Sequence, residues 1–314
     1  IGSSAGYSGI GANKNVFIGK SAGRTAVEVQ ESVAIGYEAA YSHLSGLTTA
    51  IGYYAGRDMT TGSNTLIGYE AGQNLTTGTY NTVVGQDALE NNLTGNRNVA
   101  IGRNALATST KSYNTAIGYG AMVNTTTTEY STGIGYFALE ELTTGDGNLA
   151  VGAVALQANT TGNYNTAIGQ ATLSANVHGD GNVAVGYYAL NDYAPADDAG
   201  YNVAMGKEAL DKLTTGVQNV GIGGAEVMGA MLTGSYNVGL GYGALAAATK
   251  TNNTAIGHKA GYATSSGTGN VFLGYLAGSD ATATDSDKLF IANAAGTPLI
   301  GGDFSAKTLT FNAD

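Results

Sequence analysis

Residues 114–122 read NTAIGYGAM, and variants of this segment recur along the whole chain. Residues 165–173 read NTAIGQATL, and residues 182–190 read NVAVGYYAL. Each copy runs from an asparagine through a β-branched residue, an alanine and an aliphatic residue to a glycine, which we call the repeat glycine. Short runs of β-branched residues bounded by asparagine and glycine are typical of β-strands. The segment therefore predicts one short strand in every copy.

The repeat glycine returns with a period of 17 residues, and the longest intervals are the 20 residues from Gly186 to Gly206 and the 18 from Gly223 to Gly241. Such a unit is too short for the helix pairs or propeller blades of other repeat proteins, so stacked β-coils remain. We expect an all-β fold, namely a parallel β-solenoid (β-roll) of about sixteen 17-residue coils, as an intertwined or side-by-side homotrimeric fibre. Residues 1–279 would form the β-roll repeat shaft, and residues 280–314 a C-terminal β-rich segment.

Two positions of the unit are predicted to have structural roles. The asparagine four residues before the repeat glycine can bond its counterparts in the coils above and below. The glycine is expected where the chain bends sharply or another backbone comes close. Representative members of the two series are Asn81, Asn98, Asn114 and Asn165, and Gly85, Gly102, Gly118 and Gly169.

The alternation of side chains along each strand predicts two different faces. Ile117, directly before a repeat glycine, is expected in an interior ladder of Ile and Val. Ala116 would then point the other way, where small residues would let another chain approach closely. We therefore expect side-by-side association, with a trimer as the natural number of chains.

Composition excludes several classes of function. The formal net charge is −10, and the 13 Lys and Arg residues are scattered singly, so we expect no nucleic-acid partner. No stretch approaches the roughly 20 apolar residues of a membrane span, which predicts no membrane insertion in this segment. Paired carboxylates, a nucleophile with a base and a phosphate-binding loop do not rise above the repeat pattern. We expect no enzyme, no catalytic residue, no metal site and no cofactor.

Tyrosines directly after the repeat glycine are the candidate contact residues. Exposed tyrosine rings can pack on sugar rings and donate hydrogen bonds, which suits a glycan-binding surface. Stacking between neighbouring coils is the alternative, because an aromatic ladder in register stabilises any solenoid. The row consists of Tyr37, Tyr53, Tyr69, Tyr119, Tyr136, Tyr187, Tyr242 and Tyr275.

Other polar residues carry weaker signals. His43, His178 and His258 lie in unrelated phases of the repeat and lack the spacing of metal ligands. The sequence GDGN at 145–148 and 179–182 is similar to calcium-binding nonapeptide repeats, but its two copies are isolated and predict turns. Threonine-rich turns suggest ice binding as a minor alternative, although they vary too much to keep a regular grid of hydroxyls.

The units NTAIGYGAM, NTAIGQATL and SVAIGYEAA resemble the head repeats of trimeric autotransporter adhesins of the YadA type. That resemblance implies a parallel β-roll that forms a tight trimer, although the repeat of the family is shorter. A closer similarity is to the NTAIGYxAL arrays of bacteriophage tail fibres and large bacterial surface proteins, and it covers almost the whole chain. Residues 287–312, DKLFIANAAGTPLIGGDFSAKTLTFN, are similar to the segment that follows such arrays in phage fibres.

These resemblances imply a role in attachment. We expect an extracellular structural and adhesive fibre protein, the shaft of a phage tail fibre on a virion that supports host attachment. Residues 280–314 would lead toward a tip or chaperone domain, which is absent after Asp314. The alternative is a bacterial trimeric surface adhesin whose β-roll binds glycans or matrix proteins. The expected partners are a homotrimer and a host-surface glycan or protein receptor.

Overall fold

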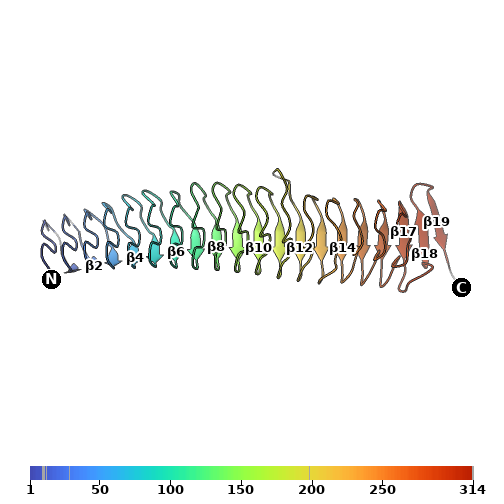
Figure 1. The fold of residues 1–314 in the computed structure, drawn as a ribbon, viewed down its shortest axis with the longest axis horizontal. Helices are drawn as coiled ribbons and strands as arrows, with labels where there is room; N and C mark the ends of the chain where they lie inside the picture. Colours follow the sequence, from blue (N-terminus) through green and yellow to red (C-terminus); the bar gives the residue numbers. More distant parts are fainter. Residues whose placement is uncertain (9–10, 12, 28, 198, 313–314) are drawn as a thin grey trace. The chain divides into compact units, whose positions relative to one another are not determined.

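The computed structural model describes residues 1–8, 11, 13–27, 29–197 and 199–312. The described chain is all-β and contains no helix. It forms a parallel β-solenoid of about 16 turns spaced by roughly 17 residues (Figure 1). The predicted all-β solenoid is confirmed, and the homotrimeric fibre stays a prediction. The chain divides into two compact units, Ile1–Thr161 and Gly162–Asp314, which we describe separately.

In unit 1 each strand pairs in parallel with the next strand in the sequence. Equivalent positions lie opposite one another, as Ala100 does with Ala116. The strands are β1 (Val16–Ile18), β2 (Val33–Ile35), β3 (Thr49–Ile51), β4 (Thr65–Ile67), β5 (Thr82–Val84), β6 (Val99–Ile101), β7 (Thr115–Ile117), β8 (Thr132–Ile134) and β9 (Leu149–Val151).

Unit 2 repeats this arrangement and then changes direction. Strands β10 to β17 pair in parallel, whereas β17, β18 and β19 form antiparallel pairs. Residues 280–314 hold the last three strands, and their status as a domain apart from residues 1–279 stays a prediction. The strands are β10 (Thr166–Ile168), β11 (Val183–Val185), β12 (Val203–Met205), β13 (Val220–Ile222), β14 (Val238–Leu240), β15 (Thr254–Ile256), β16 (Val271–Leu273), β17 (Lys288–Ile291), β18 (Ile300–Asp303) and β19 (Thr308–Phe311).

The two faces of the strands are the reverse of what the sequence predicted. The middle residue of each three-residue strand points into the coil, and Ala100 and Ala167 are 0% exposed. The residue before the repeat glycine points outward, so that Ile67, Ile168 and Leu273 are 36%, 39% and 43% exposed. The expected interior ladder of Ile and Val was therefore wrong. We call the middle residues the inner row and the residues before the repeat glycine the outer row.

The narrow width of the coil explains why alanine lies inside. Large side chains four residues after the repeat glycine, such as Leu106, are also fully buried and fill the interior. A β-carbon on the inner-row residue Gly133 would lie 2.9 Å from Cγ of Met122. Where the inner-row residue has a large side chain, as Leu66 does, a glycine lies against it. A β-carbon on Gly56 would lie 2.5 Å from Cδ1 of Leu66. Close packing thus limits the summed volume of the two positions.

The repeat glycines are required by backbone contact between coils. Gly85, Gly102 and Gly118 have φ angles of +142°, +130° and +138°, where residues with a side chain are strained. A β-carbon on Gly102 would lie 2.3 Å from the carbonyl oxygen of Gly118, and one on Gly169 would lie 2.4 Å from that of Gly186. No side chain fits at either position without moving the neighbouring coil.

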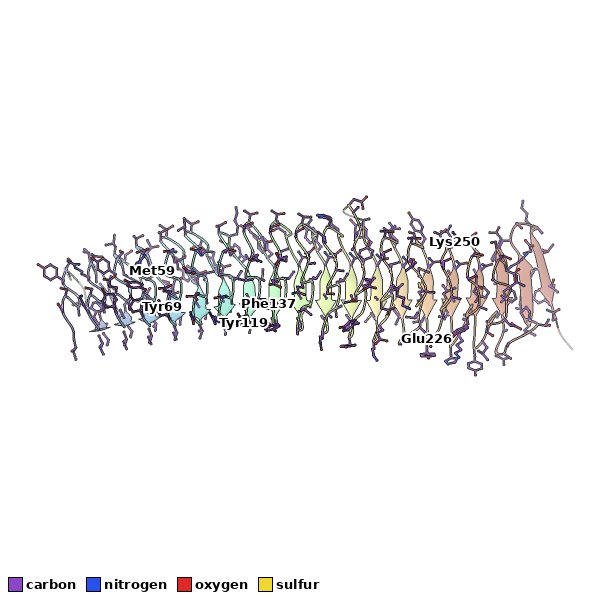
Figure 2. The ribbon with its side chains drawn as sticks, in the orientation of Figure 1. Met59, Tyr69, Tyr119, Phe137, Glu226 and Lys250 are labelled. Atoms are coloured by element: carbon purple, nitrogen blue, oxygen red, sulfur yellow. The ribbon has the colours of Figure 1, made fainter. Side chains whose placement is uncertain are left out.

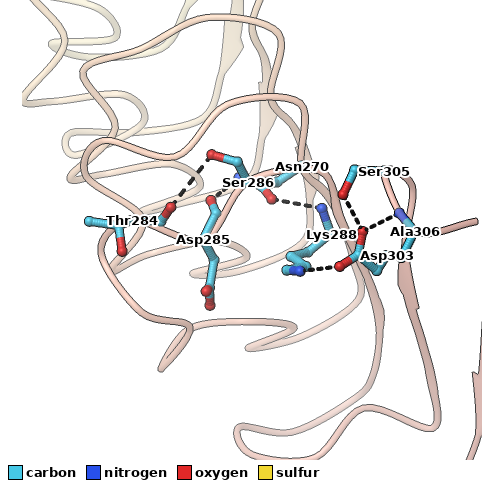
Figure 3. A network of polar contacts seen from close by, with 8 residues as sticks. All are labelled: Asn270, Thr284, Asp285, Ser286, Lys288, Asp303, Ser305 and Ala306. Carbon is cyan, nitrogen blue, oxygen red and sulfur yellow. Dashed lines mark hydrogen bonds and ion pairs between the residues drawn. The ribbon is translucent and has the colours of Figure 1, made fainter. Parts of the chain in front are cut away.

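A polar network joins the last parallel coil to the antiparallel strands (Figure 3). The backbone N–H of Lys288 donates to Oδ1 of Asn270 (3.0 Å), and Nδ2 of Asn270 donates to the carbonyl oxygen of Asp285 (2.7 Å). Nζ of Lys288 lies 2.5 Å from Oδ2 of Asp303 in β18. That bond, together with the N–H of Ala306, holds the pKa of the Asp303 carboxyl well below its usual range. Strand β17 therefore connects the antiparallel strands β18 and β19 to the parallel strands of the solenoid.

Replacement of a repeat glycine is expected to disrupt its coil. We predict that Gly169→Ala lowers the free energy of unfolding by more than about 3 kcal/mol, because the added β-carbon meets backbone that cannot rotate away. Gly224→Ala is the matched control in the same unit, since its β-carbon would have only an ordinary contact, 3.8 Å from Tyr242. Urea unfolding followed by circular dichroism measures both variants. Equal stability of the two would contradict the contact argument.

Candidate functional site

The buried asparagines link neighbouring coils by hydrogen bonds between a side chain and the backbone. The N–H of Asn81 donates to Oδ1 of Asn64 (2.8 Å), and the N–H of Asn98 donates to Oδ1 of Asn81 (2.9 Å). The N–H of Asn114 continues the series to Oδ1 of Asn98 (2.9 Å). Each of these residues is at most 3% exposed. Buried backbone N–H groups are thereby satisfied at a position where the chain turns.

The amide nitrogen of each side chain donates a hydrogen bond to a backbone carbonyl group of the following coil. Nδ2 of Asn81 donates to the carbonyl oxygen of Gly95 (2.9 Å), and Nδ2 of Asn165 donates to that of Gly179 (2.7 Å). Both ends of the amide are thus engaged by the backbone. The geometry favours a structural role for this series over a role in ligand binding.

Loss of one ladder amide is expected to be costly. Asn98→Ala removes the acceptor of the Asn114 N–H and the donor to the Lys111 carbonyl (2.8 Å). We predict a loss of about 2–4 kcal/mol in the free energy of unfolding, because two buried polar groups lose their partners. Asn74→Ala is the control, since the Asn74 side chain makes only an exposed bond to Asn91. If the two variants unfold at the same urea concentration, the ladder contributes nothing specific.

The predicted tyrosine row forms short stacks in unit 1. Tyr37, Tyr53 and Tyr69 stack in succession, with ring centroids 5.2 Å apart in each pair and interplanar angles of 12° and 5°. Tyr119 and Tyr136 form a second stack at 5.7 Å. The rings remain accessible, and Tyr53 and Tyr136 are 40% and 55% exposed. Stacking between coils is present, and contact with glycans stays a prediction.

In unit 2 the same row is divided differently. His258 lies between Tyr242 and Tyr275 and stacks on both, at 5.5 and 5.4 Å. Tyr187 contacts Tyr188 of its own coil at 4.4 Å in a tilted arrangement. The row is therefore a set of separate aromatic stacks within each unit, one of which includes a histidine.

Neighbouring groups raise the pKa of several of these tyrosines. A hydrogen bond with Glu38 raises the pKa of Tyr37, and a hydrogen bond with Tyr54 raises that of Tyr53 to about 12. The hydroxyls stay protonated at neutral pH and can donate hydrogen bonds. Lys20 lies 5.5 Å from the centre of the Tyr37 ring, so this stack also carries a cation at one end. Half-exposed rings with protonated hydroxyls have the chemistry to contact a saccharide.

Turn residues that resemble calcium-binding or ice-binding patterns form hydrogen bonds with backbone groups instead. Oδ1 of Asp146, in the first GDGN segment, accepts a hydrogen bond from the N–H of Glu129 (2.7 Å). Oγ1 of Thr60 donates to the carbonyl oxygen of Thr76 (3.0 Å). Among the described residues, no group of three or more His, Cys, Asp or Glu side chains could hold a metal ion. Within the same ranges, no helix is long and apolar enough to cross a membrane.

His43 is a core residue. It is 1% exposed, and Nε2 lies 3.1 Å from the carbonyl oxygen of Gly46. Nδ1 has no hydrogen-bond partner in the described part of the chain. Burial lowers the pKa of His43 to about 4, because the charged ring would lose its hydration. The imidazole is therefore neutral at pH 7.

Acidification is expected to destabilise the coil that contains His43. Between pH 6.5 and pH 4 the unfolded chain binds a proton that the folded coil excludes, so stability falls as the pH is lowered. We predict a loss of about 3 kcal/mol over this range. His43→Asn, which places at this position the residue found at the equivalent buried positions Asn92 and Asn159, should abolish that part of the pH dependence. Hydrogen exchange of residues 36–52 at several pH values measures both proteins, and identical pH profiles would refute the assignment.

A recess in unit 2 is a surface feature that sequence reasoning did not single out. It has a volume of about 570 Å³, and its lining includes Asp211, Glu226, Ala246 and Tyr262. Two signals in the sequence could have indicated it. The interval from Gly223 to Gly241 is one residue longer than the period, and residues 223–230 read GGAEVMGA, which is rich in small side chains.

Comparison with known proteins assigns no family to the chain. No protein-family model matches the sequence, no curated protein matches it, and no solved structure matches the fold. The function is therefore argued from the fold and its surfaces.

Proposed function

We propose that the chain is a structural and adhesive fibre protein, the shaft of a phage tail fibre that supports host attachment. Three copies would pack along their outer rows. The observation that carries the proposal is the outer row itself, an apolar face of a parallel sheet that is open to solvent in the single chain. The proposal includes an extracellular location on a virion and no enzymatic activity.

The outer row is unusual for a parallel sheet. In strands β6 and β11 the outer-row residues Ile101 and Val185 point outward, where both are only partly buried. Parallel sheets in proteins are normally covered on both faces. A contiguous exposed apolar surface is typical of an interaction site. A covering partner accounts for aliphatic residues at positions where a solvated face would carry polar ones.

A second copy of the chain is the partner that fits this surface best. The outer row repeats once in every coil, so an identical chain presents the same spacing and stays in register along the sheet. A globular partner would cover only part of the row. The number three comes from the resemblance of the repeats to those of trimeric fibres.

Connections between coils support a structural role as a shaft. Repeat glycines bring backbones into contact, and ladder amides such as Asn98 bond to the coils on either side. A rigid shaft requires many such contacts and hydrogen bonds between each coil and the next. The net charge of −10 disfavours nucleic acid as a partner, so an attachment role to a cell surface fits better than a genome-associated one.

The alternative function is a bacterial trimeric surface adhesin whose β-roll itself binds glycans or matrix proteins. The half-exposed stack of Tyr37, Tyr53 and Tyr69 favours it, because aromatic rings in a row can contact successive sugars. A glycan array probed with the chain and with a Tyr37, Tyr53 and Tyr69→Ser variant distinguishes the two functions. Binding that the triple variant abolishes supports the adhesin, whereas a passive shaft binds nothing through this stack.

Oligomeric state tests the proposed fibre. We expect light scattering of the purified chain to give the mass of three chains. A triple Ile101→Lys, Ile117→Lys and Ile134→Lys variant should have the mass of one chain and an unchanged β-sheet spectrum, because buried lysines in the interface would be unpaired.

The matched control carries the same three charges elsewhere on the coils, as Asn74→Lys, Asn91→Lys and Asn124→Lys. It should keep the mass of the unmodified protein. A single-chain mass for the unmodified protein at all concentrations would overturn the fibre proposal, as would dissociation by the control variant.

A further inference from the structure

We propose that the recess in unit 2 is a binding site for an uncharged saccharide. It lies in one chain, between the coils that follow Gly206 and Gly257, and is separate from the stack of Tyr37, Tyr53 and Tyr69. The site deepens the attachment role proposed above and rests on it for its biological purpose. Its existence does not depend on how many chains form the fibre.

An extra residue in one coil shapes the recess. The N–H of Met228 donates to the carbonyl oxygen of Ala244 (3.0 Å), which is the bond that Leu245 makes with Ala260 (3.0 Å) in the next coil. Met228 is five residues after its repeat glycine, whereas Leu245 is four residues after its own. The additional residue lies in the segment before Met228, and Glu226 there has a φ angle of +80°. The coil bulges at this point, and Glu226 lies at one edge of the coils, away from Lys250 (Figure 2).

Small side chains make the floor of the recess. Gly229 and Ala230 in one coil and Ala246 and Ala247 in the next line it. The preceding coil has Asp211 and Lys212 at the equivalent places, and the following coil has Tyr262. Two coils with short side chains between two with long ones leave a depression with walls on both sides.

The walls and floor offer both kinds of contact that a sugar ring makes. The Tyr262 ring and the alanine methyls can pack on the C–H faces of a sugar, while the carboxylates of Glu208, Asp211 and Glu226 accept hydrogen bonds from its hydroxyls. A volume of about 570 Å³ is in the range of small-ligand sites. A compact ring with apolar faces and a polar rim fits this distribution.

The polar groups are held in place before any ligand arrives. Nζ of Lys259 lies 5.0 Å from the centre of the Tyr262 ring and holds a cation against it. Glu226 forms a hydrogen bond with Tyr242, and this bond raises the pKa of that tyrosine. Burial raises the pKa of Asp211, and Asp211 forms no ion pair with the described residues. The Asp211 carboxylate accepts a hydrogen bond from the backbone N–H of Lys212, and its remaining acceptor positions can receive a hydrogen bond from a sugar hydroxyl.

Charge narrows the ligand class. Three carboxylates line the recess, and three lysines balance them: Lys212 in the lining, Lys207 paired with Glu208 (3.2 Å) and Lys259 beside the Tyr262 ring. The recess therefore has no excess of positive charge that would favour a sialic acid, a sulfate or a phosphate. A metal ion does not fit either, since the described residues contain no group of ligands that could hold one. An uncharged sugar can donate hydrogen bonds to the carboxylates without adding a charge to the recess.

The test is a titration of the purified full chain with neutral oligosaccharides. A glycan array that carries neutral and sialylated glycans identifies the probe, and calorimetry measures its affinity. We expect binding to neutral members alone. Ala247→Trp, which fills the recess, and Tyr262→Ala, which removes one wall, should each weaken binding at least about tenfold. Tyr236→Ala is the matched control, since it removes an exposed tyrosine of the same unit that lies outside the recess, and it should leave the affinity within about twofold.

Circular dichroism and light scattering on the same variants show whether fold and mass are kept. The inference is overturned if no neutral glycan binds, if a sialylated glycan or a lysine-rich peptide binds instead, or if the filled recess binds as well as the original. Failure of the fibre proposal is a different result, namely a single-chain mass with sugar binding intact. A mass of three chains without sugar binding would refute the recess alone.

Discussion

Backbone contact between neighbouring coils at the repeat glycine is the constraint on which the rest of the structure depends. At Gly102 the space for a β-carbon is already occupied by the Gly118 carbonyl group of the next coil. Glycine therefore recurs at this place, at most copies in a conformation that other residues rarely adopt. Hydrogen bonds between paired strands set the spacing of the coils, and glycine lets the backbones meet at that spacing. At the same spacing, ladder amides such as Asn98 reach both neighbours and aromatic rings such as Tyr53 stack.

The interior of the coils is narrow, and its limited volume determines which residues are left outside. The inner row and the fourth residue after a repeat glycine share a limited space, so Met122 faces the glycine at position 133, and Phe272 is accompanied by Gly278. The aliphatic residues of the outer row are excluded from the core by volume, although they are the most apolar residues of the strand. A surface of this kind has a free-energy cost when it is solvated, which is the physical basis for proposing that other copies of the chain cover it.

Departures from the repeat are where specific chemistry is found. Regular coils engage their polar groups with one another, as the amide of Asn81 and the hydroxyl of Thr60 show. The longer coil after Gly223 interrupts that pattern and leaves the carboxylates of Asp211 and Glu226 beside a depression. In a solenoid, an irregular coil can acquire a binding function without disturbing its neighbours, because each coil contacts only the adjacent ones.

The sequence by itself determined the period, the strand in each unit, the all-β solenoid and the positions of the glycine and asparagine series. These follow from local rules, since a repeated pattern of strand and turn residues leaves few folds open. Only the tertiary structure decided which strand face is buried. Alternation showed that Ala116 and Ile117 point in opposite directions but could not say which points inward. That choice depends on the space inside the coils, as at the inner-row residue Gly133, where a β-carbon would lie 2.9 Å from Cγ of the buried Met122 in the neighbouring coil. The recess likewise depends on side chains of four successive coils, and no local pattern specifies how residues 17 or more positions apart in the sequence enclose a common space.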